Sequence, residues 1–189
     1  RLGGRYSHYW LGGDDLLSEL SANIEWHYRL APQWQTQASL TLSDQDNLRN
    51  NDLDLLQAET QLGAAFSAEQ FSVQFALVLA TDDGEQDYQA RDTLGLNINA
   101  QQLLNIHNSL YASLILRDYQ FQGEIPADNL LAGGETRAEQ MTQAMVGYGY
   151  TLLPTLTFYT QLSHVQYDSN LPLYEYDRTL LEAGVNLTF

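Results

Sequence analysis

Charged side chains in several extended stretches are separated by even numbers of residues, a spacing that places them on one face of a strand. Charges on an enclosed face must be paired or hydrated, because burying an unpaired charge is costly. We predict that they form an ion-pair network that plugs and stiffens the interior of the fold. The alternative is a narrow conduit with a charge-selective lining. The residues concerned are Arg5, Glu19, Glu25, Arg29, Glu59, Arg91, Arg117, Arg137, Glu139, Arg178 and Glu182.

The elements expected to position these charges are strands, because apolar and polar residues alternate with a period of two along most of the chain. Between residues 20 and 30 the apolar face carries Leu20, Ala22, Ile24, Trp26, Tyr28 and Leu30, and the intervening residues are polar. The pattern recurs at 34–42, 56–66, 71–79, 94–98, 110–116, 144–150, 156–162 and 183–189, and a first strand is expected at about Arg5 to Leu11. The sequence therefore predicts about ten antiparallel strands, within a range of roughly eight to twelve.

The lengths of these strands and of their connections favour a membrane barrel over a soluble one. A tilted membrane crossing needs about 9–11 residues, whereas strands of soluble proteins average about 5–6. Short turns are expected near Pro32, Ser67, Gln101 and Pro154, and polar loops at about 45–52, 82–85, 119–135 and 169–175 alternate with them, as in outer-membrane barrels. Aromatic residues near the turns would form a girdle at the periplasmic interface: Tyr28, Trp34, Phe66, Phe71, Tyr148, Tyr150, Phe158 and Phe189. The alternative is a soluble β-protein whose apolar face points inward.

The last eight residues carry a more specific pattern. They place a polar residue, a glycine, a hydrophobic residue and a final aromatic residue at Glu182, Gly184, Leu187 and Phe189. This spacing resembles the C-terminal insertion signal of bacterial outer-membrane β-barrel proteins. The resemblance implies an outer-membrane location, recognition by the barrel assembly machinery, and contact with outer-membrane lipid and lipopolysaccharide.

A second resemblance concerns the segment from Tyr174 to Arg178 together with the closing strand. It is similar to the end of barrels linked to tetratricopeptide-repeat domains in export and surface-assembly proteins, which implies other envelope proteins as partners. No helical repeat with a period of about 34 residues accompanies it here.

Composition limits the remaining possibilities. The 189 residues are expected to form a single domain, 1–189, and the chain opens mid-pattern at Arg1, so upstream sequence could be missing. A net charge of −16 without any lysine argues against a nucleic-acid partner. The absence of cysteine excludes disulfides and thiolate metal sites, and we expect no cofactor and no bound metal. No apolar run is long enough for a transmembrane helix.

Most acidic residues fall in or beside the expected outer loops. They are Asp14, Asp15, Asp44, Asp46, Asp52, Asp82, Asp83, Glu85, Asp87, Glu124, Asp128, Glu135, Asp168, Glu175 and Asp177. The interpretation that we favour is a solvated loop surface, and the alternative is a bridge to anionic lipopolysaccharide through divalent cations.

Enzymatic interpretations are weaker. His107 and Ser109 are two residues apart, so on a strand they would point the same way, as nucleophilic catalysis requires. That triplet resembles the one in outer-membrane lipid A deacylases, yet it is expected near a periplasmic turn, far from lipid A, and lacks a third acid. Omptin-type proteases have about ten strands and use Asp and His at the outer rim. Of the histidines here only His8 and His164 could approach that rim, and the chain is short for the tall extracellular extension of that family.

We therefore expect an all-β, antiparallel, up-and-down transmembrane barrel with both termini in the periplasm. The expected function is non-enzymatic: an anchor, scaffold or narrow passage in an envelope assembly of the bacterial outer membrane. The alternatives are a porin-like transport pore and an outer-membrane hydrolase.

The insertion signal gives a first testable prediction. Deletion of Phe189 removes the terminal aromatic residue on which the resemblance depends, and we expect it to reduce assembly in cells sharply. Assembly would be measured as the amount of folded protein in isolated outer membranes, relative to the unmodified protein. Unchanged assembly would count against the role of the signal.

Overall fold

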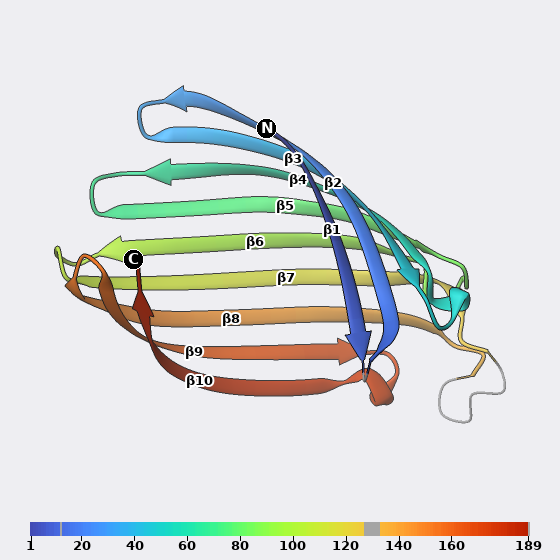
Figure 1. Ribbon diagram of the computed structural model, residues 1–189. Helices are drawn as coiled ribbons and strands as arrows, with labels where there is room; N and C mark the ends of the chain where they lie inside the picture. The colour runs from blue at the N-terminus through green and yellow to red at the C-terminus, as the bar shows by residue number, and fades with distance from the viewer. Residues whose placement is uncertain (12, 127–132, 189) are drawn as a thin grey trace.

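A single antiparallel sheet accounts for nearly the whole chain in the computed structural model, which describes residues 1–11, 13–126 and 133–188 (Figure 1). Each strand is hydrogen-bonded to the next one in sequence, so the topology is up-and-down. The strands are β1 (Leu2–Leu11), β2 (Asp14–Ala31), β3 (Trp34–Asn47), β4 (Leu55–Ser67), β5 (Phe71–Gly84), β6 (Arg91–Leu103), β7 (Asn108–Glu124), β8 (Thr136–Leu153), β9 (Leu156–Ser169) and β10 (Tyr176–Leu187). The predicted strand number and topology are confirmed. The sheet is not closed, because β1 and β10 remain its two edges.

Alternation along each strand gives the sheet two chemically different faces. The registers align apolar residues of successive strands into rows, one of which contains Ile24, Leu40, Thr60, Leu79 and Leu94. The residues on either side of these positions in each strand belong to the other face, which is largely polar. Because the registers run without a break through the middle of the sheet, the two faces stay distinct from β1 to β10.

The apolar face lies on the convex side of the curled sheet. Ile24, Val146 and Leu181 on this face are 57%, 57% and 72% exposed, so no apolar core covers them. The few buried side chains within the strands lie on the opposite, concave face, among them Val78, Asp82 and Glu139. The arrangement is the reverse of a soluble barrel, in which the apolar residues fill the interior.

Connections at the two ends of the sheet differ in length. The four turns at one end have two to four residues, whereas four of the five connections at the other end have six or more. The exception is the connection of β1 to β2, which spans only residues 12 and 13. The predicted asymmetry is confirmed for the remaining connections. We call these ends the turn end and the loop end.

Several predicted loop boundaries were wrong, because strands continue beyond the apolar stretch. Asp82 and Asp83 lie within β5, and Tyr119 lies within β7, although all three were expected in loops. Hydrophobic alternation stops near these residues, but backbone pairing with the neighbouring strands does not. The strands therefore extend past the apolar band toward the loop end.

Helical structure is limited to two single turns within the described residues, η1 (Asn51–Leu53) and η2 (Pro172–Tyr174). Neither these turns nor any other described segment forms a helix long and apolar enough to cross a membrane.

Candidate functional site

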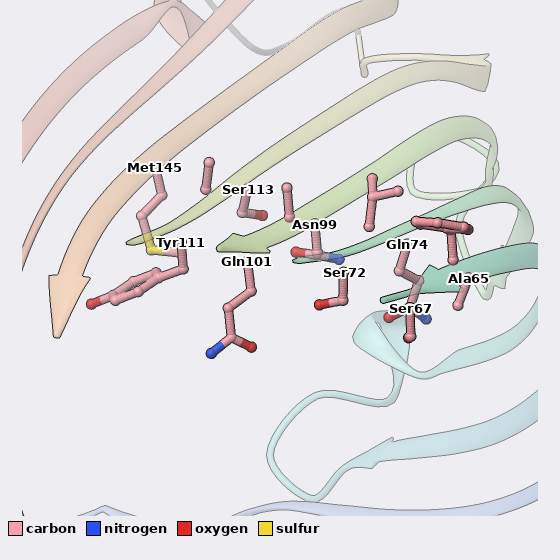
Figure 2. A pocket seen from close by; sticks show the side chains of 13 residues that line it. Ala65, Ser67, Ser72, Gln74, Asn99, Gln101, Tyr111, Ser113 and Met145 are labelled. Carbon is pink, nitrogen blue, oxygen red and sulfur yellow. The ribbon is translucent and has the colours of Figure 1, made fainter. Parts of the chain in front are cut away.

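The concave face of the sheet gathers most of the polar side chains of the strands, and we call it the inner wall. Near the turn end it is lined by small and amide-bearing residues that face a cavity of about 370 Å³. Figure 2 shows the side chains of Ser72, Gln74, Asn99, Gln101 and Ser113 directed toward the interior. This part of the inner wall is uncharged and rich in hydrogen-bonding groups, so it is suited to contact with water or polar solutes.

Large side chains of the inner wall lie against glycines of the neighbouring strand. The ring of Tyr159 covers Gly184, and a Cβ atom added to this glycine would come within 2.6 Å of the tyrosine hydroxyl. The ring of Tyr111 lies over Gly147 in the same way. The guanidinium of Arg117 lies over Gly95. The missing glycine side chains therefore let these bulky groups lie along the wall.

Toward the loop end the inner wall carries a buried ion pair. Arg91 Nε donates to Asp82 Oδ2 over 2.6 Å, and Gln57 Nε2 donates to Asp82 Oδ1 over 2.8 Å. The guanidinium of Arg91 also lies 4.7 Å from the ring centre of Tyr119, in a cation–π contact. The Asp82 side chain is 2% exposed, so its charge depends on these two partners.

A second arginine continues this arrangement. Arg137 lies between two aromatic rings, 3.7 Å from the centre of Phe121 and 4.4 Å from that of Tyr174. Its Nε atom is 3.3 Å from a carboxylate oxygen of Glu139. Tyr174 belongs to η2 and packs against a small apolar cluster formed by Ile125 and Leu171. The stacked rings and guanidinium groups thus tie the loop after β9 to the inner wall, and we call this set the arginine–aromatic ladder.

In the described part of the chain the predicted charged residues fall into separate ion pairs and hydrogen-bonded groups. Arg5 pairs with Glu19 over 3.2 Å on the first two strands, far along the sheet from the ladder. Arg29 donates to the carbonyl oxygens of Ala31 and Pro32 at the turn. Arg117 donates to the carbonyl oxygen of Leu116, and Arg178 lies on the inner face of β10.

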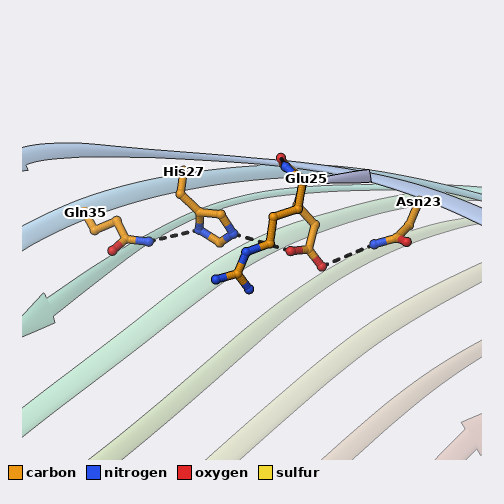
Figure 3. A network of polar contacts seen from close by, with 5 residues as sticks. Asn23, Glu25, His27 and Gln35 are labelled. Atoms are coloured by element: carbon orange, nitrogen blue, oxygen red, sulfur yellow. Dashed lines mark hydrogen bonds and ion pairs between the residues drawn. The ribbon is translucent and has the colours of Figure 1, made fainter. Parts of the chain in front are cut away.

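Three predicted glutamates of the inner wall, Glu25, Glu59 and Glu182, are held mainly by amides. Asn23 Nδ2 donates to Glu25 over 3.2 Å, and His27, which is bonded to Gln35, lies 3.5 Å away (Figure 3). Glu59 accepts from Gln61, and Glu182 accepts from Gln161, each over 2.6 Å.

Sequence reasoning missed Asp82, the buried partner of Arg91. Its position next to Asp83 and Gly84 suggested a loop, and the apolar alternation of β5 ends before it. Asp82 is separated from Ala76 and Val78 by even numbers of residues. A longer β5 would therefore have placed all three on the same face of the strand.

Charge is unevenly distributed between the inner wall and the rest of the chain. Within the described strands the inner wall carries six arginines and six carboxylates, out of the eight and 24 in the whole sequence, so its formal charges cancel. The net charge of −16 therefore resides outside the inner wall. Among the outer carboxylates whose side chains the structure describes, only Glu69 lies at the turn end. Asp52 and Asp128 were also predicted in the acidic loops, and their side chains are not among those that the structure describes.

The histidines do not form a recognisable catalytic group. His107 donates through Nδ1 to the carbonyl oxygen of Thr151 over 2.7 Å, and no contact joins it to Ser109 in the described part of the chain. His8 lies 3.0 Å from Asp15, and His164 is bonded to Thr179, both on the convex face. Within residues 1–11, 13–126 and 133–188, no group of three or more metal-ligating side chains converges on a common point.

The insertion-signal residues occupy the closing strand as the alternation predicts. Glu182 and Gly184 face the inner wall, and Leu187 faces the convex side with 61% exposure. Phe189 lies outside the described residues.

No protein-family model matches the chain, and a search of curated proteins finds no relative.

The contact between Tyr111 and Gly147 gives a prediction about the inner wall. Gly147→Ala should displace the Tyr111 ring and destabilise the fold by about 1–3 kcal/mol, the usual cost of overpacking. In a Tyr111→Ala background the same change should cost much less, because the ring is gone. Denaturant unfolding in detergent measures both. Equal costs in the two backgrounds would contradict the contact.

Proposed function

We propose that this chain is an integral outer-membrane β-barrel that encloses a narrow polar passage. The observation that carries the proposal is the two-faced sheet, with exposed apolar residues on the convex side and polar residues on the concave side. An apolar surface of this extent in water would favour aggregation, whereas in a bilayer it is matched by lipid tails.

The dimensions of the apolar band support a membrane crossing. On β6 the convex face is apolar or small between Asp92 and Gln102, about the 9–11 residues that a tilted strand needs. Aromatic side chains concentrate on the convex face at the turn end. Trp34 and Phe71 both approach the ring of Phe66, with centroid distances of 5.2 and 6.5 Å. Such a belt suits a membrane interface, and the turn end would then lie in the periplasm.

A location in the membrane requires the sheet to close into a barrel. Unpaired strand edges are not tolerated in lipid, so β1 and β10 must be satisfied in the membrane. A strand tilt of about 35–45° displaces the register by roughly 10–14 residues over ten strands. When the pairing partner of Leu2 is followed from each strand to the next, the series ends at Asp168 on β9, which lies next to the start of β10. With that displacement Leu2 lies opposite about Val185 to Leu187, and β10 covers all of β1.

The contacts on the inner wall favour a passage over a plug. Ion pairs and hydrogen bonds there join residues of the same strand or of nearby strands, as between Asp82 and Arg91 or between Tyr111 and Gln161. In the described part of the chain none of them reaches across the interior. Side chains that lie flat over glycines leave the central space to water.

Lipopolysaccharide is the proposed neighbour of the loop end. The acidic residues there would repel its phosphates directly, so divalent cations would have to bridge the two surfaces. At the turn end the nearly uncharged surface would face the periplasm.

A charge placed on the convex face tests the membrane assignment. Leu77→Arg should reduce the folded fraction, because an arginine near the bilayer midplane costs about 2–4 kcal/mol. Asp83→Arg, on the same face of the same strand beyond the apolar band, is the matched control and should be tolerated. The folded fraction would be read from gel mobility before and after boiling in detergent. Equal tolerance of the two variants, or a protein soluble without detergent, would overturn the assignment.

Barrel closure can be tested with introduced cysteines, because the chain has none of its own. The register derived above places Ser7 opposite Leu180 or Glu182. We expect one of the pairs Ser7→Cys with Leu180→Cys or Ser7→Cys with Glu182→Cys to form an intramolecular disulfide in membranes. Ser7→Cys with Ala80→Cys, on a distant strand, is the control. Cross-linked dimers alone, or no cross-link, would contradict direct closure.

A further inference from the structure

Three carboxylates of the inner wall form no ion pair with an arginine side chain in the described part of the chain. Glu59 accepts a 2.6 Å hydrogen bond from Gln61, and Glu182 accepts one of the same length from Gln161. Glu25 accepts a 3.2 Å bond from Asn23 (Figure 3). Amide donors stabilise an ionised carboxylate through hydrogen bonds but do not cancel its charge. These residues are therefore local sites of negative potential on a wall whose formal charges cancel in sum.

The other carboxylates of the inner wall are neutralised in place. Asp82, Glu139 and Glu19 each lie within 3.3 Å of an arginine nitrogen. Counted from the loop end of each strand, Asp82 and Glu139 lie two and three residues in, Glu59 lies four, Glu19 five, Glu182 six and Glu25 eleven. Asp82 and Glu139 are thus the wall carboxylates nearest the loops, and the amide-held Glu182 and Glu25 are the farthest from them.

The three amide-held carboxylates come from separate parts of the sheet, β2, β4 and β10. In a closed barrel they would approach the passage from different directions, so that a solute would meet more than one of them. The cationic groups that form no pair with a wall carboxylate side chain are differently held. Arg178 lies on the inner face of β10, and the N-terminal ammonium of Arg1 donates to the backbone oxygen of Glu25 over 2.6 Å. Arg29 is bonded to turn carbonyls at the rim, and Arg117 lies flat over Gly95. His27 is bonded to Gln35 and Glu25.

The negative charge of the loop end would also favour cations over anions. Its carboxylates surround the entrance of the proposed passage, and a field of one sign at an entrance raises the local concentration of counter-ions. Cations would be concentrated at the loops and would then meet Glu25, Glu59 and Glu182 along the wall.

We infer that the passage selects small hydrated cations over anions, and that Glu25, Glu59 and Glu182 determine this selectivity. The inference rests on the proposed function, because it requires a closed, water-filled barrel. It adds the class of solute and the residues that choose it.

The test is the reversal potential of the full chain in planar bilayers under a KCl gradient. The unmodified protein should favour K⁺ over Cl⁻ by a factor of about three or more. The triple variant Glu25→Gln, Glu59→Gln and Glu182→Gln should lose this preference, since glutamine keeps the shape and removes the charge. Glu69→Gln removes one carboxylate at a turn outside the inner wall and should leave the ratio unchanged.

Each outcome is decisive. Channels without cation preference, or a triple variant with unchanged selectivity, would overturn the inference while leaving the passage itself in place. A folded barrel without any conductance would overturn both the passage and the inference. Gel mobility before and after boiling shows whether each variant is folded. If the triple variant fails to fold, the single variants Glu59→Gln and Glu182→Gln take its place, and each should lower the ratio.

Discussion

Backbone pairing is the constraint on which the rest of this structure depends. Adjacent strands satisfy each other's backbone N–H and C=O groups through antiparallel hydrogen bonds. From β3 to β7 this pairing runs without a register shift. Side chains alternate between the two faces along each strand, and paired residues of adjacent strands lie on the same face. An unbroken register therefore keeps the apolar residues of all these strands on one face and the polar residues on the other. A slip of a single residue would move leucines to the concave side and glutamines to the convex side. The segregation of polar and apolar chemistry is therefore a consequence of register as much as of composition.

Glycine has a specific role on the inner wall. In an interior of about ten strands, large side chains would fill most of the space if they projected straight inward. Tyr111, Tyr159 and Arg117 instead lie over Gly147, Gly184 and Gly95 on the adjacent strand. A glycine in a strand usually weakens it, because no side chain packs there. Here the neighbouring ring or guanidinium group supplies that packing, and the arrangement keeps the wall both covered and thin.

The sequence alone predicted the strands and the two faces, because both depend on local alternation. It failed where alternation ends while pairing continues, as at Asp82 and Tyr119, which extend β5 and β7 beyond the apolar band. It also could not identify ion-pair partners. Parity places Arg91 and Glu59 on the same face, but only the register between strands shows that Arg91 lies opposite Asp82 and that Glu59 is bonded to Gln61. Which side chains form an ion pair or hydrogen bond depends on how neighbouring strands are paired, and this pairing cannot be predicted from the sequence of one strand.

The separation of charge explains how a chain with a net charge of −16 can have an inner wall whose formal charges cancel. An enclosed charge is costly unless it is paired or hydrogen-bonded, and on the inner wall Arg91 and Arg137 pair with Asp82 and Glu139, while other arginines there bind backbone carbonyl oxygens. Few arginines then remain for the loops, and the carboxylates there are left in excess. Their mutual repulsion is weakened by water and salt, which screen exposed charges beyond about 8 Å. Because most of the eight arginines lie on the inner wall, the charges there balance and the loop end is left acidic.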